Sequence, residues 1–368
     1  MGSHRDFHLP QGHYLLNHSV GRPLKSLAAH LQQHYFTPWC EGAVEPWGTW
    51  LQGVDDFRTQ LAILFDSDAR LFCPQTNLSS GLTKLLQSLP AGKLNILMSE
   101  ADFPSMGFVM QHARDDIAQR FIAKTEDMSD PEVWLAHLDD SLDWVFVSQV
   151  YSNTGQQAPL AAICTRAKQL GIRVIVDVAQ AAGVLPLSLL QLQPDALLGS
   201  SVKWLCGGPG AAYLWVCDAL LAECQPKDVG WFSHANPFEF DIHHFAYHPD
   251  ALRFWGGTPS VQSYISAAHA IAYFNQLGVA QVRAHNWQLL TDLHQALGDW
   301  VVSPREQNRA SGTAIVNLPQ GNQALLKALK AAQIAVDERA LGIRISPHIY
   351  NSAADIAALV AVVNGQRA

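Results

Sequence analysis

The sequence predicts an α/β fold, in which helices cover both faces of a mostly parallel sheet and a small α+β unit follows. Short apolar runs alternate with amphipathic stretches between residues 77 and 216. The runs are rich in Val, Ile and Leu at successive positions, and the pattern changes after about residue 250. Strands that are apolar on both faces are typical of parallel sheets buried between layers of helices.

The predicted elements follow one another in an order that supports this class. Segments with the composition of buried strands lie at residues 94–99, 144–150, 173–179, 195–201 and 211–216. Amphipathic segments typical of helices lie at residues 82–89, 108–114, 130–138 and 159–171. The last of these helices ends at a glycine, which is a common stop signal.

Both ends of the chain lack the alternation of apolar strands and helices that predicts the central sheet. The stretch to about Phe65 is predicted to be helical, and a long helical region is predicted over residues 260–297. Short strands with an intervening helix and a final helix from about Ser352 complete the α+β unit. We expect three parts: residues 1–45 packing with the small domain, residues 46–261 forming the large domain, and residues 262–368 forming the small C-terminal domain.

Composition restricts the class of protein. Of the 368 residues, 48% are hydrophobic and 15% are charged, which favours a well-filled core. A net charge of −8 and a pI near 6.0 argue against nucleic-acid or anionic-membrane partners. The six cysteines lack metal-binding or paired spacing, and no apolar segment fits a signal peptide or a membrane span. We therefore expect a soluble, cytoplasmic protein without structural disulfides.

Common catalytic motifs are absent from the sequence. It contains no GxxxxGK[ST] loop, no GxSxG elbow and no HExxH. The glycine-rich stretch after Lys203 precedes a predicted strand, whereas the glycines of a dinucleotide-binding fingerprint precede a helix. A nucleotide-binding α/β protein is thus a remote alternative. His243, His244 and His248 cluster in one segment, but with 16 histidines in the chain we expect a polar surface loop and no metal.

Lys203 and Asp177 are the residues that stand out. Asp177 lies at the carboxyl end of one predicted strand and Lys203 follows the next strand, so both are expected in the crevice where open α/β sheets bind ligands. A desolvated lysine can form a Schiff base, and a carboxylate can keep a pyridine nitrogen protonated. Taken singly, Lys203 would be explained as a lysine that extends to solvent and Asp177 as the cap of a helix. Together, the two residues favour a catalytic role.

The segments "VDVAQAAGVLPL" and "DALLGSSVKWLCGGPGAAYL" resemble the class V aminotransferase superfamily of pyridoxal-phosphate (PLP) enzymes, which have fold type I with a mostly parallel, seven-stranded-type sheet. The resemblance runs from about Tyr14 to the C-terminus. It implies that Lys203 forms the aldimine with PLP and that Asp177 pairs with the pyridinium nitrogen. It further implies cofactor contacts from Gln180 near the phenolic oxygen and from Leu78, Ser79 and Ser200 at the phosphate.

Other segments resemble the kynureninase branch. "DFPS" would stack Phe103 on the cofactor ring, "GWFSH" would offer Trp231 to the phosphate, and "LRFWGGTPS" would extend Thr258 to the phosphate of a neighbouring subunit. Arg344 in "IRISPHIYNS" would bind the α-carboxylate of the substrate. Two positions depart from this branch: Val202 replaces a tyrosine and Met106 replaces the usual aspartate.

The resemblance implies a homodimer with shared active sites and an amino-acid substrate. Transamination is the expected reaction, and kynureninase-like hydrolytic cleavage of a carbon–carbon bond is the alternative. Cysteine desulfurase chemistry is disfavoured because it needs a cysteine in the last third of the chain, whereas the last cysteine is Cys224. A non-catalytic binding protein that keeps the fold is the remaining alternative, which retention of Lys203, Asp177 and Arg344 disfavours.

Overall fold

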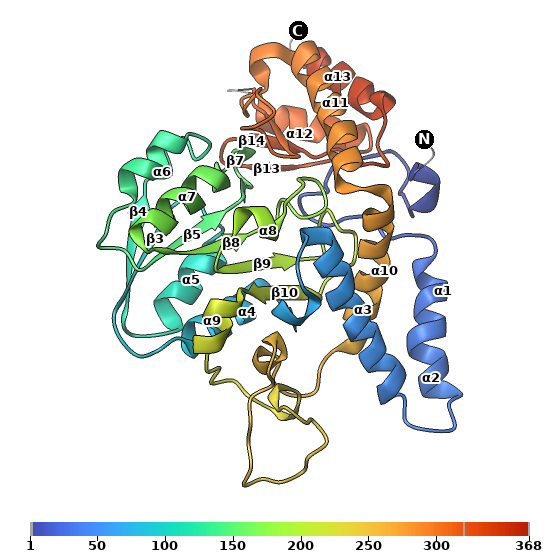
Figure 1. Ribbon diagram of the computed structural model, residues 1–368. Helices are drawn as coiled ribbons and strands as arrows, with labels where there is room; N and C mark the ends of the chain where they lie inside the picture. Colours follow the sequence, from blue (N-terminus) through green and yellow to red (C-terminus); the bar gives the residue numbers. More distant parts are fainter. Residues whose placement is uncertain (1–2, 319–320, 367–368) are drawn as a thin grey trace.

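A computed structural model describes residues 3–318 and 321–366 (Figure 1). At its centre lies a seven-stranded sheet with the strand order β2-β10-β9-β8-β5-β3-β4. The strands are β2 (Phe72–Gln75), β3 (Leu94–Ser99), β4 (Ile117–Ile122), β5 (Trp144–Ser148), β8 (Arg173–Asp177), β9 (Ala196–Ser200) and β10 (Ala212–Val216). Strands β9, β8, β5, β3 and β4 pair in parallel, and β10 is antiparallel to both its neighbours. The prediction of a mostly parallel sheet is confirmed.

Helices cover both faces of this sheet. In Figure 1, α6 (Pro131–His137) and α7 (Leu160–Leu170) lie on one side, and α4 (Leu78–Ser88) and α5 (Pro104–His112) lie on the other. The short helices α8 (Leu189–Leu192) and α9 (Asp218–Glu223) complete the cover. Every residue of β5 and β10 is buried, which explains their continuous apolar composition.

Strands β2 and β4 are absent from the sequence prediction. The sequence of β2, "FCPQ", contains Pro74, which argues against a strand when the sequence is read alone. Strand β4 lies at the edge of the sheet, and only its last residue, Ile122, is fully buried. Edge strands can carry polar and charged residues such as Arg120, so the continuous apolar signal is missing there.

The long helical region predicted near residue 260 is two helices, α10 (Val261–Leu277) and α11 (Val279–Leu297). Gly278 separates them with a φ of 85°, a conformation that favours glycine. Helix α10 packs on α3 (Trp47–Phe65) within the larger hydrophobic core, whereas the second half of α11 belongs to a smaller core. The division of the chain into domains at residues 45 and 261 stays a prediction.

The N-terminal segment connects the two cores. Residues 7–26 are not helical, so the helical prediction is wrong there; the helical part starts with α1 (Leu27–Leu31) and continues, through a π-helical turn, into α2 (Thr37–Cys40). Phe7 is buried in the larger core and Leu15 in the smaller one. Strand β1 (His13–Tyr14) pairs with β12 (Ile334–Ala335), far away in the sequence.

The smaller core contains a three-stranded sheet, β11 (Ala314–Val316), β14 (Gly342–Ile345) and β13 (Asp337–Arg339). Helices α11, α12 (Asn322–Ala331) and α13 (Ala353–Gly365) cover it. All six cysteines are unpaired. Within residues 3–318 and 321–366, no helix is both long and apolar enough to cross a bilayer.

Candidate functional site

A cavity of about 250 Å³ lies at the carboxyl ends of the parallel strands. Its lining includes Ser148, the last residue of β5, Asp177, the last residue of β8, and Lys203, which follows β9. Open α/β sheets bind ligands at this edge. The strand order therefore brings together side chains that are far apart in sequence, as the sequence analysis expects for Lys203 and Asp177.

Lys203 and Asp177 share one electrostatic environment inside this cavity. Burial lowers the pKa of Lys203, and the nearby Asp177 carboxylate partly opposes that shift. Burial raises the pKa of Asp177, against the hydrogen bond from the Ala179 backbone and the charge of Lys203. Asp177 Oδ1 accepts from the Ala179 nitrogen at 2.7 Å, so it does cap the following turn, while its side chain also lines the cavity.

The N-terminus of α4 forms another part of the wall. Asn77 is the N-cap, and its Oδ1 accepts from the Ser80 nitrogen at 2.9 Å. Leu78 and Ser79 are the first helical residues, and both line the cavity. Backbone N–H groups of the first helical turn have no partner within the helix, and the helix dipole favours an anion beside them. This end of the cavity is suited to a phosphate group.

Phe103 lies at the opening of the cavity, at the residue before α5, and its side chain is 58% exposed. The preceding Asp102 fixes this turn, because its two oxygens accept from the Ser99 nitrogen at 2.8 Å and the Ser148 hydroxyl at 2.7 Å. Burial raises the pKa of Asp102 to about 7. A large exposed aromatic ring at the edge of a cavity is suited to stacking on a flat ligand.

The N-terminal segment packs directly on the lysine turn. The Gly21 nitrogen donates to the Val202 carbonyl at 2.8 Å, and a Cβ added to Gly21 would lie 2.0 Å from the Lys203 carbonyl oxygen. Gln180 also lines the cavity and donates from Nε2 to the His18 carbonyl at 3.1 Å. Only glycine allows this approach, so residues near the chain start hold both Lys203 and Gln180 in place.

Arg344 is buried on β14 and paired with Asp337 on β13. Its Nε donates to Asp337 Oδ1 at 2.8 Å, and its Nη2 pairs with the other carboxylate oxygen. Its Nη1 lies 3.5 Å from the carbonyl of Ser152, which lines the cavity. Burial raises the pKa of Asp337, but hydrogen bonds from His18 and Arg344 outweigh it and hold that pKa well below the ordinary value.

Four of the residues singled out in the sequence do not line the cavity: Ser200, Trp231, Thr258 and Arg344. Arg344 reaches its border through Ser152. Ser200 instead accepts a hydrogen bond from the Val202 nitrogen at 3.4 Å. Trp231 donates from Nε1 to the Thr258 hydroxyl at 3.2 Å, so these two residues lie together outside the cavity.

Several residues that line the cavity are missing from the predicted site, among them Tyr151 and Ser148. The Tyr151 hydroxyl is buried and has no hydrogen-bond partner among the described residues. The signal that identifies them is the one used for Asp177: Ser148 ends the buried run "WVFVS" of β5, and Tyr151 follows three residues later. Met106, 2% exposed, lines the cavity as well.

These side chains fit PLP. The cavity offers an amine that burial keeps reactive, a buried carboxylate for a ring nitrogen, an aromatic face, an anion-binding helix end and an unpartnered hydroxyl at Tyr151. A buried hydroxyl without a partner is unfavourable, and a polar ligand would satisfy it. Each chemical feature of the cofactor thus has a matching group in the wall.

Comparison with known families and sequences agrees with this fit. The family model described as "Aminotransferase class-V" matches residues 78–359. A protein named "Uncharacterized aminotransferase YcbU" from Bacillus subtilis (strain 168) is 26% identical over 321 residues, which cover 83% of this chain and 82% of the relative. A kynureninase from Burkholderia pseudomallei (strain K96243) is 27% identical over 359 residues, covering 90% of this chain and 83% of the relative.

Solved structures show the same fold. A cysteine desulfurase from Thermococcus onnurineus NA1 in its apo form has a TM-score of 0.86 at 17% identity, covering 96% of this chain and 94% of that chain. A C-DES mutant with glycine covalently linked to its PLP cofactor also has a TM-score of 0.86, at 22% identity, covering 96% of each chain. At these identities the likeness supports the fold alone.

Proposed function

The chain belongs to the aminotransferase class-V family of PLP-dependent enzymes, and from this premise we propose that it transfers the amino group of an α-amino acid to a 2-oxo acid. The observation that carries the proposal is the placement of Lys203 and Asp177 in one cavity under Phe103. Transamination needs a base at the α-carbon, a carboxylate at the ring nitrogen and a site for the substrate carboxylate. The wall of the cavity supplies the first two, and Arg344 lies at its border.

Lys203 is the proposed Schiff-base residue and the base. Since burial lowers the pKa of its amine, the neutral form is available at a lower pH than for an ordinary lysine. When substrate occupies the cavity, Lys203 Nζ takes the proton from the substrate α-carbon and later returns one. Bound PLP supplies an electron sink for the resulting carbanion.

Asp177 and Tyr151 are proposed to bind polar atoms of the cofactor. One oxygen of Asp177 accepts from the Ala179 nitrogen, which fixes the plane of its carboxylate. The carboxylate would hold the ring nitrogen of bound PLP in its protonated form. The Tyr151 hydroxyl is free to donate into the cavity. Leu78 and Ser79 offer backbone N–H groups to the phosphate at the start of α4, and Ser200 and Gln180 stay predicted contacts.

Arg344 is proposed to bind the substrate carboxylate through the edge that Asp337 leaves open. Asp337 occupies Nε and one Nη2 hydrogen, so Nη1 is the nitrogen that is directed toward Ser152 and the cavity. A guanidinium held in this way is already oriented when substrate arrives. Closure of the smaller core against the larger one would bring Arg344 nearer the substrate and exclude water.

Kynureninase-like hydrolysis is the second candidate, because kynureninase relatives match 90% of the chain. The buried, apolar Met106 stands in the cavity where that branch usually has aspartate, which favours transamination. Cysteine desulfuration is disfavoured further by the state of the cysteines. None of the six lines the cavity, and burial raises the pKa of the Cys224 thiol to about 11.

A homodimer with shared active sites also belongs to the proposal. Trp231 and Thr258 form a hydrogen-bonded pair outside their own chain's cavity. We assign them to the site of a second copy. We expect the purified protein to sediment as a dimer and the Thr258→Ala variant to bind PLP more weakly. A cytoplasmic location stays a prediction.

One experiment separates the reactions. The holoenzyme is incubated with single amino acids, first without and then with an added 2-oxo acid. Without an added 2-oxo acid, a transaminase yields about one equivalent of product per active site and then stops. It turns over repeatedly only when the acceptor is present. A lyase turns over kynurenine to anthranilate and alanine without an acceptor. Turnover without an acceptor, or no product from any amino acid, would reject the proposed transamination.

A further inference from the structure

A long loop joins the 3-10 turns η4 (Trp231–Ser233) and η5 (Ala251–Phe254) and projects from the body of the protein (Figure 1). It carries large apolar side chains in solvent: Phe240 is 84% exposed and Ile242 is 93% exposed. The loop, which lies within the described residues 3–318, contains no helix and no strand, and its one isolated β-bridge joins His234 to Tyr247. The middle of this loop is therefore not held by regular secondary structure.

His234, at the base of this loop, is buried, with 6% of its surface exposed. Its Nδ1 lies 2.8 Å from the Asn236 carbonyl oxygen and 3.0 Å from the Asn236 backbone nitrogen, which can donate to it. Its Nε2 is buried without a hydrogen-bond partner among the described residues. In the tautomer that donates Nδ1–H to the carbonyl, Nε2 carries a lone pair with no partner among those residues. This is the arrangement found for metal-binding histidines, whose second nitrogen donates to a carbonyl or carboxylate.

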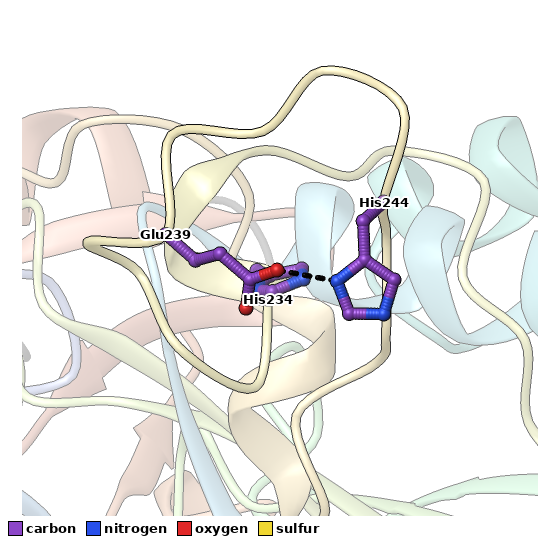
Figure 2. A group of neighbouring side chains, drawn as sticks. All are labelled: His234, Glu239 and His244. Atoms are coloured by element: carbon purple, nitrogen blue, oxygen red, sulfur yellow. Dashed lines mark hydrogen bonds and ion pairs between the residues drawn. The ribbon is translucent and has the colours of Figure 1, made fainter.

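Glu239 and His244 approach His234 from the tip of the loop (Figure 2). They form an ion pair through His244 Nδ1 and Glu239 Oε1. One ligand atom from each of the three residues lies within 4.8 Å of the others. Two imidazoles and a carboxylate at this separation are close enough to supply one ligand atom each to a single cation.

We propose that His234, Glu239 and His244 bind one divalent metal ion of the zinc class. Two nitrogens and one oxygen form a borderline donor set that suits Zn²⁺ and disfavours Ca²⁺ or Mg²⁺, which prefer oxygen alone. The bound ion would satisfy His234 Nε2 and replace the pair between Glu239 and His244. None of the three residues lines the cavity around Lys203, so this site and the proposed transamination can be tested separately.

The histidine cluster noted in the sequence, His243, His244 and His248, differs from this proposed site. His243 is exposed next to His244. His248 forms an ion pair with Asp250 at 2.6 Å, and Asp250 also pairs with Arg58. The expectation of no metal rests on that cluster, and only His244 of its three histidines belongs to the proposed site. The ion would connect residues 234, 239 and 244 and so close two short loops, the second of which contains Phe240 and Ile242.

The test is titration of the holoenzyme with Zn²⁺ alone, followed by calorimetry and by metal analysis after dialysis. We expect one equivalent per chain in the wild type, and a loss of affinity of at least about tenfold in Glu239→Gln and His244→Ala. His243→Ala is the matched control, because it removes an exposed imidazole from the same loop, and it should bind Zn²⁺ as the wild type does.

A second readout reports on the loop itself. Chymotrypsin cleaves after exposed aromatic residues, and Zn²⁺ should slow cleavage at Phe240 in the wild type and in His243→Ala but leave it unchanged in His244→Ala. The proposal is overturned if Zn²⁺ binds equally to all four proteins, if His243→Ala loses the ion as His244→Ala does, or if no stoichiometric binding occurs. The last outcome would leave Glu239 and His244 as an ion pair only.

Discussion

Two groups of buried charges border the cavity, and they differ in how burial is compensated. Around Lys203 and Asp177, burial is the dominant effect and moves both pKa values toward the neutral forms. Around Asp337, hydrogen bonds from His18 and Arg344 outweigh burial and keep the carboxylate charged. The first group lies on the large sheet, and the second lies on the sheet of the smaller core.

The difference indicates different tasks. A group whose charged form is poorly compensated gains or loses a proton readily, as a base at a reacting carbon must. A charge that is fully paired keeps one position and one protonation state, as a binding group for a carboxylate must. The wall of the cavity therefore holds a reactive pair, and a fixed cation lies at its border. Substitutions in the two groups should have different kinetic signatures.

The largest effect is expected for Asp177→Asn. The amide can still accept from the Ala179 nitrogen, but it cannot hold a protonated ring nitrogen, so kcat should fall by roughly 10²- to 10⁴-fold. Asp195→Asn is the matched control, since Asp195 also caps a backbone nitrogen, that of Val174 at 2.8 Å, outside the cavity. Steady-state kinetics check this, and equal kcat values for the two variants would contradict the assigned role.

Asp337→Asn should act on substrate binding. Without the carboxylate, Arg344 loses its fixed orientation, and KM for the amino acid should rise by about 10- to 100-fold while kcat changes little. Glu338→Gln is the control on the same strand, because Glu338 binds Gln323 and not Arg344. A drop in kcat at constant KM would assign Asp337 to the reactive group and remove the contrast between the two sides.

His348 extends the comparison to a buried imidazole behind the lysine turn. Its Nε2 lies 2.7 Å from the Trp204 carbonyl, and burial lowers its pKa to about 4. The folded state therefore takes up this proton at lower pH than the unfolded state, whose pKa is the ordinary 6.5, so the stability due to His348 falls as pH decreases through 6.5 toward 4.

Relative to a His348→Gln variant, the wild type should lose about 2 kcal/mol of unfolding free energy between pH 7 and pH 5. Urea unfolding at the two pH values measures this difference. The comparison with the variant cancels other buried groups such as Asp102, whose raised pKa of about 7 acts in the opposite direction. A difference between the two proteins that does not change with pH would show that His348 is not neutralised by burial.

The smallest effect is expected for Tyr151→Phe. Removal of an unpartnered buried hydroxyl should leave the stability of the apo protein nearly unchanged, yet it should weaken PLP binding by about tenfold if the hydroxyl donates to the cofactor. Tyr213→Phe is the control, because its hydroxyl is also buried and unpartnered but does not line the cavity. Equal PLP affinities measured by fluorescence titration would exclude Tyr151 as a cofactor contact.

The sequence predicts the central parts of this fold because their signals are local. Strands such as β8 are largely continuous apolar runs, Asp177 is the last residue of β8, and Lys203 lies three residues after the end of β9. Chain order then places both residues at one edge of the sheet. The edge strand β4 and the proline-containing β2 carry no such signal, and their strand conformation depends on neighbours that the sequence does not reveal.

Contacts between segments that are distant in the sequence cannot be predicted from such local patterns. The approach of Gly21 to Lys203 and the pairing of His18 with Asp337 join residues more than 180 positions apart. The pairing of Arg344 with Asp337 has no pattern in the sequence, because β13 and β14 are too short to show a period. The resemblance identifies Arg344 as a binding residue, whereas only the structure shows which of its nitrogens Asp337 occupies.

The most direct test of the account is the attachment site of PLP. The holoenzyme is reduced with borohydride, digested and mapped by mass spectrometry, beside a Lys203→Ala variant treated in the same way. We predict a pyridoxyl label on Lys203 and none on Lys84, whose amine donates to the Phe254 and Trp255 carbonyls. A label on another lysine, or equal labelling of the variant, would contradict the central claim that Lys203 is the reactive amine of this cavity.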